Sequence, residues 1–221
     1  MARSDSYPDG TPLDAADRHL AAADPAMRGL IARWGPVAEV ELPEASREHF
    51  GSLILAIVSQ QFSTRAARAM FDRIMGQYSG RLPTPAELLA TDLDELRVAA
   101  GLSHAKARAI RSLAEHIESG ALDLDGLPGL PDDEVRRQLV AVDGIGDWTA
   151  GVFLLFTLHR PDVLLANDLG IRKGVRDAYG LGGLPDATTV TRLAEPWRPH
   201  RTRACLYLWR SLETAPVPVS S

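Results

Sequence analysis

The chain has 221 residues, 45% hydrophobic and 24% charged, and its formal net charge of −5 does not point to a nucleic-acid partner. It has no run of about eighteen apolar residues, and its first residues, MARSDSYPDG, lack the apolar core of a secretory signal, so we expect neither a membrane span nor export. The single cysteine, Cys205, excludes an internal disulfide and four-cysteine metal sites, and we expect a monomer in the reducing cytoplasm.

Nearly every periodic segment of the sequence has helical spacing, and no run alternates convincingly at the period of a strand. Gly35 and Pro36 stop the first helix, while Ser63 and Ser103 are expected N-caps. In chain order, helices are predicted at 14–33, 47–59, 63–78, 85–90, 92–99, 103–120, 132–141, 147–159, 169–179, 186–195 and 200–213. We therefore expect an all-α protein with two helical lobes around a cleft.

Basic residues gather on four segments, although the whole chain is acidic. These segments are 65–73, 97–111, 172–176 and 198–210. Such local clusters can contact phosphates. They can equally be solvated helix faces, and charge alone does not decide between the two.

The most informative stretch lies between the helices at 132–141 and 147–159. Gly144 and Gly146 bracket one apolar residue, Ile145, which can pack between the two helices. The amides of this turn and of the helix start beyond it, including Asp147 and Thr149, would form a phosphate-binding site at the positive end of a helix dipole. An ordinary turn between two helices explains the same pattern.

The hairpin is followed by an apolar helix, a loop with Asn167 and Asp168, and a basic helix. This order resembles the helix-hairpin-helix DNA glycosylase superfamily, and within it the 3-methyladenine DNA glycosylase II branch. The other segments that carry the resemblance are 24–36, 54–67 and 101–114. The resemblance implies the family's two helical lobes, with 50–165 as one and 1–49 together with 166–221 as the other. The N-terminal β-rich lobe of the bacterial enzyme that defines the branch is expected to be absent.

The resemblance implies hydrolysis of an N-glycosidic bond, with Asp168 as the catalytic carboxylate. A carboxylate can stabilise the oxocarbenium character of the sugar and orient the attacking water. Asp168 could also be the N-cap of the helix at 169–179, and the two roles are compatible. Leu165 and Ala166 stand where the family commonly has a proline, which puts the rigidity of this loop in doubt. Trp148 occupies the position of the lysine of bifunctional relatives, so no lyase activity is expected.

The resemblance also assigns a base pocket and a wedge. The pocket would contain Trp209 and Trp148, whose rings suit a cationic base, together with Val152 and Arg210 at positions where the bacterial archetype has tyrosines. Core packing is the alternative for both tryptophans. Gln61, next to Gln60, matches the residue that fills the gap left by the extruded base. An exposed glutamine at a helix break is the other interpretation.

The expected partner is double-stranded DNA with damaged bases, gripped through the backbone by the hairpin residues 144–147 and Thr149. The expected reaction is excision of alkylated purines: 3-methyladenine, 7-methylguanine and, in a wide pocket, 1-methyladenine. The alternatives are a glycosylase of deaminated or mismatched bases and a non-catalytic DNA-binding protein. No catalytic metal or cofactor is expected. The resemblance allows a structural sodium or potassium ion at the backbone near Val142.

Overall fold

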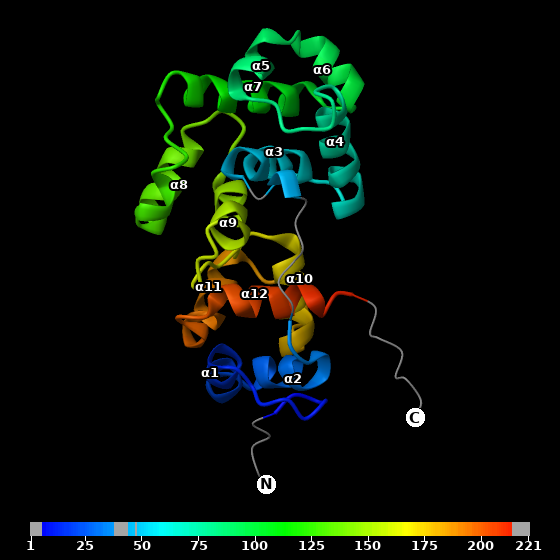
Figure 1. The fold of residues 1–221 in the computed structure, drawn as a ribbon. Coiled ribbons are helices and arrows are strands. Elements are labelled where there is room, and N and C mark those ends of the chain that lie inside the picture. The colour runs from blue at the N-terminus through cyan, green and yellow to red at the C-terminus, as the bar shows by residue number, and fades with distance from the viewer. Residues whose placement is uncertain (1–5, 38–43, 47, 214–221) are drawn as a thin grey trace. The chain divides into compact units, whose positions relative to one another are not determined.

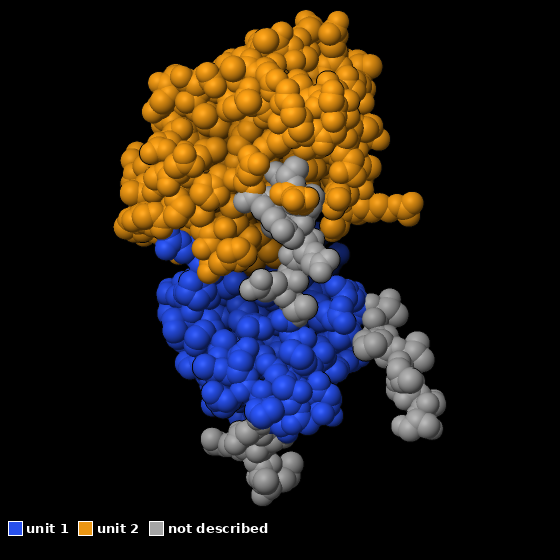
Figure 2. Space-filling model, in the orientation of Figure 1, with its two compact units in different colours: residues 1–40, 160–221 blue, residues 41–159 orange. Residues whose placement is uncertain are grey.

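A computed structural model describes residues 6–37, 44–46 and 48–213 of the chain. These residues form twelve α-helices and three short 3-10 helices, and the only β-pairing among them is an isolated bridge between Ser6 and Pro12. No helix in this part of the chain is long and apolar enough to cross a membrane. The expected all-α class is confirmed, and the chain divides into two compact units (Figure 2).

One unit comprises Glu41–His159, and α3 lies at its centre. Helices α4, α7 and α9 all pack on α3, and α5 and α6 pack on α7 (Figure 1). The core side of α3 is strongly apolar, with Leu53, Ile54 and Ile57 fully buried. The helices of this unit are α3 (His49–Ser59), α4 (Thr64–Gly76), α5 (Pro85–Ala90), α6 (Leu93–Ala100), α7 (His104–Glu118), α8 (Asp132–Val140) and α9 (Asp147–Phe156), with 3-10 turns at Glu44–Ser46 and Leu127–Gly129.

The other unit joins both ends of the chain, Met1–Val40 and Arg160–Ser221. Helix α12 contacts α1, α2 and α10, and its Tyr207 and Leu208 are fully buried (Figure 1). The helices of this unit are α1 (Ala15–Ala23), α2 (Pro25–Trp34), α10 (Leu169–Tyr179), α11 (Ala187–Leu193) and α12 (Arg201–Arg210), with a 3-10 turn at Glu195–Trp197.

Local capping explains most helix boundaries. The hydroxyls of Ser63 and Ser103 accept the backbone amides of Ala66 and Lys106, so both expected N-caps are confirmed. The helix expected over 14–33 is instead two helices. The helix is interrupted at Asp24. The carboxylate of Asp24 caps α2, and Pro25 occupies the first helical position.

Asp24 also ties helices together within its unit. Its carboxylate accepts a hydrogen bond from Trp197 Nε1 at 2.8 Å and another from the Tyr179 hydroxyl at the end of α10. A second buried carboxylate, Asp17 on α1, accepts the Tyr207 hydroxyl of α12 at 2.7 Å. Burial and these carboxylates raise the pKa values of both tyrosines, which therefore remain donors. The two helices that carry the candidate catalytic residues are thus fixed to α1 and α2.

Candidate active site

Asp168 is the N-cap of α10, and it has a second partner from α12. Its Oδ1 accepts the backbone amide of Ile171 at 2.8 Å and the indole Nε1–H of Trp209 at 2.9 Å. The capping role weighed from the sequence is therefore confirmed, and the carboxylate is oriented by a tryptophan 41 residues further along the chain. Two donors on one oxygen restrict the rotation of the carboxylate.

Close packing keeps this pair together. Gly170 lies in the first turn of α10, and a Cβ atom there would lie 2.9 Å from Trp209 Cδ1 and 3.0 Å from Asp168 Oδ1. Only a residue without a side chain therefore permits the observed contact between the carboxylate and the indole.

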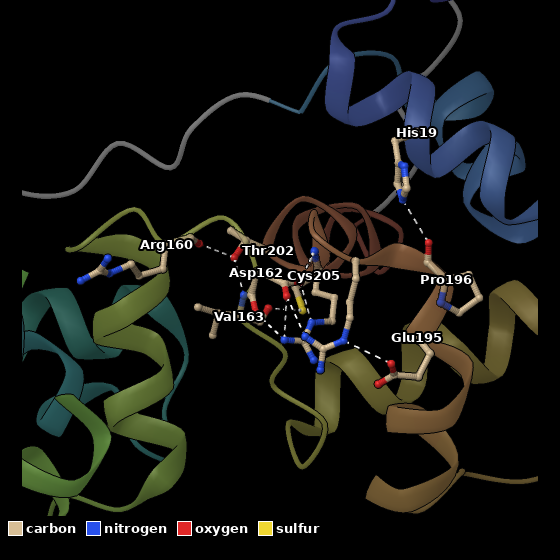
Figure 3. Close-up of polar contacts among 10 residues, drawn as sticks. His19, Arg160, Asp162, Val163, Glu195, Pro196, Thr202 and Cys205 are labelled. Carbon is tan, nitrogen blue, oxygen red and sulfur yellow. Dashed lines mark hydrogen bonds and ion pairs between the residues drawn. The ribbon is translucent and has the colours of Figure 1, made fainter. Parts of the chain in front are cut away.

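The loop before Asp168 lacks the proline that the family commonly has there, and it is held by hydrogen bonds and ion pairs to the start of α12 (Figure 3). Asp162 accepts Arg201 Nε at 2.7 Å and Arg198 Nη1 at 2.9 Å. Thr202 Oγ1 accepts the amide of Val163 at 3.0 Å and donates to the carbonyl of Arg160 at 2.6 Å. Burial alone would raise the pKa of Asp162, but its hydrogen bonds and ion pairs with the arginines hold it below the ordinary value. The same helix thus anchors this loop and supplies Trp209.

In the other unit, the hairpin between α8 and α9 has the expected geometry. Gly144 has a positive φ of 85°, and a Cβ atom there would lie 2.4 Å from the Cβ of Ala109 on α7. Ile145 is buried, at 3% exposed, which agrees with its predicted packing between the two helices. The amide of Ile145 donates to the carbonyl of Val142 at 3.0 Å, which closes the turn.

The N-terminus of α9 has no side-chain cap among the described residues, as is typical of helix N-termini that bind anions. Gly146 is the N-cap. The first amides of a helix lack intrahelical acceptors, so they are the groups that would bind a phosphate. Asp147 is exposed and paired with Arg136 at 2.8 Å, whereas the side chain of Thr149 is buried and accepts the Gln60 amide at 2.9 Å. A contribution of Thr149 to phosphate binding would thus come from its backbone.

The expected pocket residues come from both units. Trp148 and Val152 are half-buried on one face of α9, one helical turn apart. Trp209 is half-buried on α12, whereas Arg210 is exposed, paired with Glu213 and stacked over Trp34 at 5.5 Å from the ring centroid. The shared pocket stays a prediction, because α9 and α12 belong to separate units.

The two glutamines of the expected wedge differ in their surroundings. Gln61 is exposed and has a positive φ of 61°. The side-chain amide of Gln60 instead donates to the carbonyl of Gly144 at 3.0 Å and to Thr149 Oγ1. Sequence reasoning did not identify this link between the glutamine turn and the hairpin.

No group of three or more histidine, cysteine, aspartate or glutamate residues that could hold a metal ion occurs in the part of the chain that the structure describes. The carbonyl of Val142 accepts one hydrogen bond and retains a second lone pair. The monovalent cation expected there is compatible with this geometry and stays a prediction.

The helical hairpin closed by two glycines, and Asp168 as the N-cap of the next helix, both lie in the segment that matches one family of DNA repair proteins. The family described as "HhH-GPD superfamily base excision DNA repair protein" matches residues 54–199, and the chain belongs to this family. DNA-3-methyladenine glycosylase 1 of Schizosaccharomyces pombe is 34% identical over 207 residues, which cover 93% of this chain and 90% of the relative.

Two solved structures are similar along nearly their whole length. The S. pombe 3-methyladenine DNA glycosylase Mag1, in complex with abasic DNA, has a TM-score of 0.83 and 34% identity, covering 90% of this chain and 96% of the other. The DNA-3-methyladenine glycosidase of Bacillus halodurans has a TM-score of 0.76 and 36% identity, covering 90% and 89%. The helical fold is therefore that of these glycosylases.

Proposed function

We propose that this protein is a DNA glycosylase that hydrolyses the N-glycosidic bond of alkylated purines in double-stranded DNA. The observation that carries the proposal is the carboxylate of Asp168, held by the amide of Ile171 and the indole of Trp209. The family of the chain and the glycosylase names of its relatives in S. pombe and B. halodurans support it.

Asp168 acts on the sugar rather than on the base. As the glycosidic bond breaks, positive charge develops on the sugar ring, and a fixed carboxylate stabilises that charge without reorganising. The same carboxylate orients the attacking water or accepts a proton from it. Because Trp209 and the helix amide fix one carboxylate oxygen, the charge is already positioned before the bond breaks.

The protein has no lyase activity and does not cleave the DNA strand. Trp148 stands where bifunctional relatives have a nucleophilic lysine, and an indole cannot form a Schiff base. The chain has only two lysines, Lys106 and Lys173. Lys106 is buried, and its ammonium group donates to three backbone carbonyls. Hydrolysis therefore leaves an intact strand with an abasic site.

The range of substrates is broad within alkylated purines. Val152 and Arg210 replace two aromatic rings of the bacterial archetype, so the pocket offers less stacking surface. A cationic base such as 3-methyladenine or 7-methylguanine leaves readily, and a pocket with few specific contacts suffices for it. Bulkier or edge-methylated bases such as 1-methyladenine are also accepted, and unmodified purines are excised very slowly.

The protein works as a monomer in the cytoplasm. Cys205 is fully buried, and burial raises the pKa of its thiol to about 12, which disfavours the reactive thiolate form. Sedimentation of the purified chain, alone and with abasic DNA, tests the monomer.

The proposal is tested by measuring base release from a panel of duplex oligonucleotides. The panel contains 3-methyladenine, 7-methylguanine, 1-methyladenine, hypoxanthine, uracil and an unmodified purine. Release of both cationic alkylpurines, with the unmodified purine nearly inert, supports the proposal. Release of deaminated or mismatched bases alone would assign another specificity to this fold, and tight binding with no release would indicate a non-catalytic DNA-binding protein.

A further inference from the structure

The turn between α3 and α4 is held from inside by one buried lysine. Lys106, on α7, is 7% exposed. Its Nζ donates to the carbonyl of Ile57 at 2.7 Å and to the carbonyls of Val58 and Gln60 at 2.9 Å each. An ammonium group has three donors, so all three are used on the last turn of α3 and the residue that follows it.

This arrangement favours the charged lysine in spite of its burial. Burial lowers the pKa of Lys106. The carbonyls at the end of a helix lack intrahelical donors and carry the negative end of the helix dipole, which attracts a cation. The Lys106 ammonium therefore supplies a donor to the carbonyls of Val58 and Gln60 inside the unit, while that of Ile57 also accepts the backbone amide of Gln60.

Gln60 connects this lysine to the hairpin. Its backbone carbonyl accepts Lys106 Nζ, while its side-chain amide donates to the carbonyl of Gly144 at 3.0 Å and to Thr149 Oγ1 at 2.9 Å. Thr149 lies in the first turn of α9, beside the amides proposed to bind a phosphate. One residue is thus bonded both to the lysine and to the start of the hairpin's second helix.

The next residue in the chain, Gln61, is the proposed wedge. Its φ of 61° lies in the left-handed region, which is unfavourable for a residue with a Cβ atom unless its neighbours impose it. The neighbours are constrained on both sides: Gln60 is bonded to the hairpin, and the ring of Phe62 lies 5.1 Å from Lys106 Nζ. Gln61 is thus exposed in a left-handed backbone conformation, between two neighbours that are held by these contacts.

We propose that Lys106 and Gln60 are positioning residues that lock the wedge turn, residues 59–62, to the hairpin. The phosphate grip of the hairpin and the insertion of Gln61 then act as one preorganised unit during base extrusion. This inference rests on the proposed function. Neither residue touches the reacting atoms, so both act through Gln61.

The test compares two substrates that differ only in the cost of extruding the damaged base. One duplex carries 7-methylguanine opposite cytosine, and the other carries it opposite an abasic-site analogue, where no base pair has to be broken. Lys106→Met removes the ammonium at similar side-chain length, and Gln60→Leu removes the amide. Gln77→Leu is the matched control, because Gln77 is an exposed glutamine in the same unit, after α4.

The quantity measured is the single-turnover rate of 7-methylguanine excision from each duplex. Both variants should lose roughly tenfold or more on the paired substrate, as expected for a misplaced group, and clearly less on the unpaired one. The control should match the wild type on both. Gln60→Leu combined with Gln61→Ala should be no slower than Gln61→Ala alone, since the two residues act in one step.

An equal loss on both substrates, or no loss on either, would overturn the inference and leave Lys106 and Gln60 with a purely structural role. If Lys106→Met does not fold, as judged by circular dichroism, the half-buried Gln60→Leu decides the question. If the wild type releases 7-methylguanine from neither duplex but binds both, the proposed function fails instead.

Discussion

Gly170 offers a way to move the candidate catalytic group without removing it. A Cβ atom at this position would lie 2.9 Å from Trp209 Cδ1, 3.0 Å from Trp209 Nε1 and 3.0 Å from Asp168 Oδ1. Non-bonded contacts of carbon are favourable at about 3.5–4.0 Å. Gly170→Ala must therefore push the carboxylate and the indole away by roughly half an ångström, or separate them.

The expected effect is a large loss of rate with a small change in stability. A catalytic group misplaced by about 1 Å can cost a hundredfold, so excision of 7-methylguanine should slow by roughly ten- to a hundredfold. Alanine is favoured over glycine in a helix by about 0.5–1 kcal/mol, which offsets part of the strain. The free energy of unfolding should accordingly change by no more than about 1–2 kcal/mol.

Single-turnover base release and urea unfolding measure the two quantities on the same preparations. Gly29→Ala is the matched control, since Gly29 is an exposed glycine of α2 where an added Cβ atom would meet nothing beyond its own helix within 4 Å. That variant should keep the wild-type rate and gain a little stability. A folded Gly170→Ala protein with the wild-type rate would refute the reasoning, because the placement of Asp168 would then not limit the reaction.

Three further predictions concern single groups of the site. Trp209→Phe keeps an aromatic ring but removes the hydrogen-bond donor to Asp168. A half-buried hydrogen bond to a charge contributes about 1–2 kcal/mol, so excision should slow about five- to thirtyfold. An unchanged rate would show that the indole does not orient the carboxylate. Borohydride added during turnover should trap no covalent protein–DNA adduct, since Trp148 replaces the lytic lysine, and a trapped adduct would contradict the hydrolytic mechanism. Gln61→Ala should weaken binding to abasic DNA and slow excision while changing stability by less than about 0.5 kcal/mol, whereas an unfolded variant would make Gln61 structural.

Local signals in the sequence predicted most of the helices. Caps such as Ser63 and Ser103 specify a helix start within a few residues, and the structure places both as expected. The break at Asp24 was missed, because the apolar spacing of 14–33 continues through it. Asp24 followed by Pro25 is itself a helix-start signal, and it could have revealed the second helix.

The contacts that position the candidate site could not be predicted in the same way. The Trp209 indole reaches Asp168 across 41 residues, and the Gln60 amide reaches the Gly144 carbonyl across 84. Periodicity and capping describe neighbours along the chain and carry no information on which distant side chains meet. The family resemblance named the individual residues, but Lys106 and its three carbonyl acceptors became apparent only from the tertiary structure.

Excision by Asp168→Asn tests the central claim most directly. Asparagine keeps the size of the side chain and an oxygen that can accept the amide of Ile171 and the indole of Trp209, so the cap of α10 is retained while the negative charge is lost. Single-turnover release of 7-methylguanine should fall by at least about a hundredfold, with binding to abasic DNA largely unchanged. Release near the wild-type rate by this variant would contradict the assignment of Asp168 as the catalytic carboxylate.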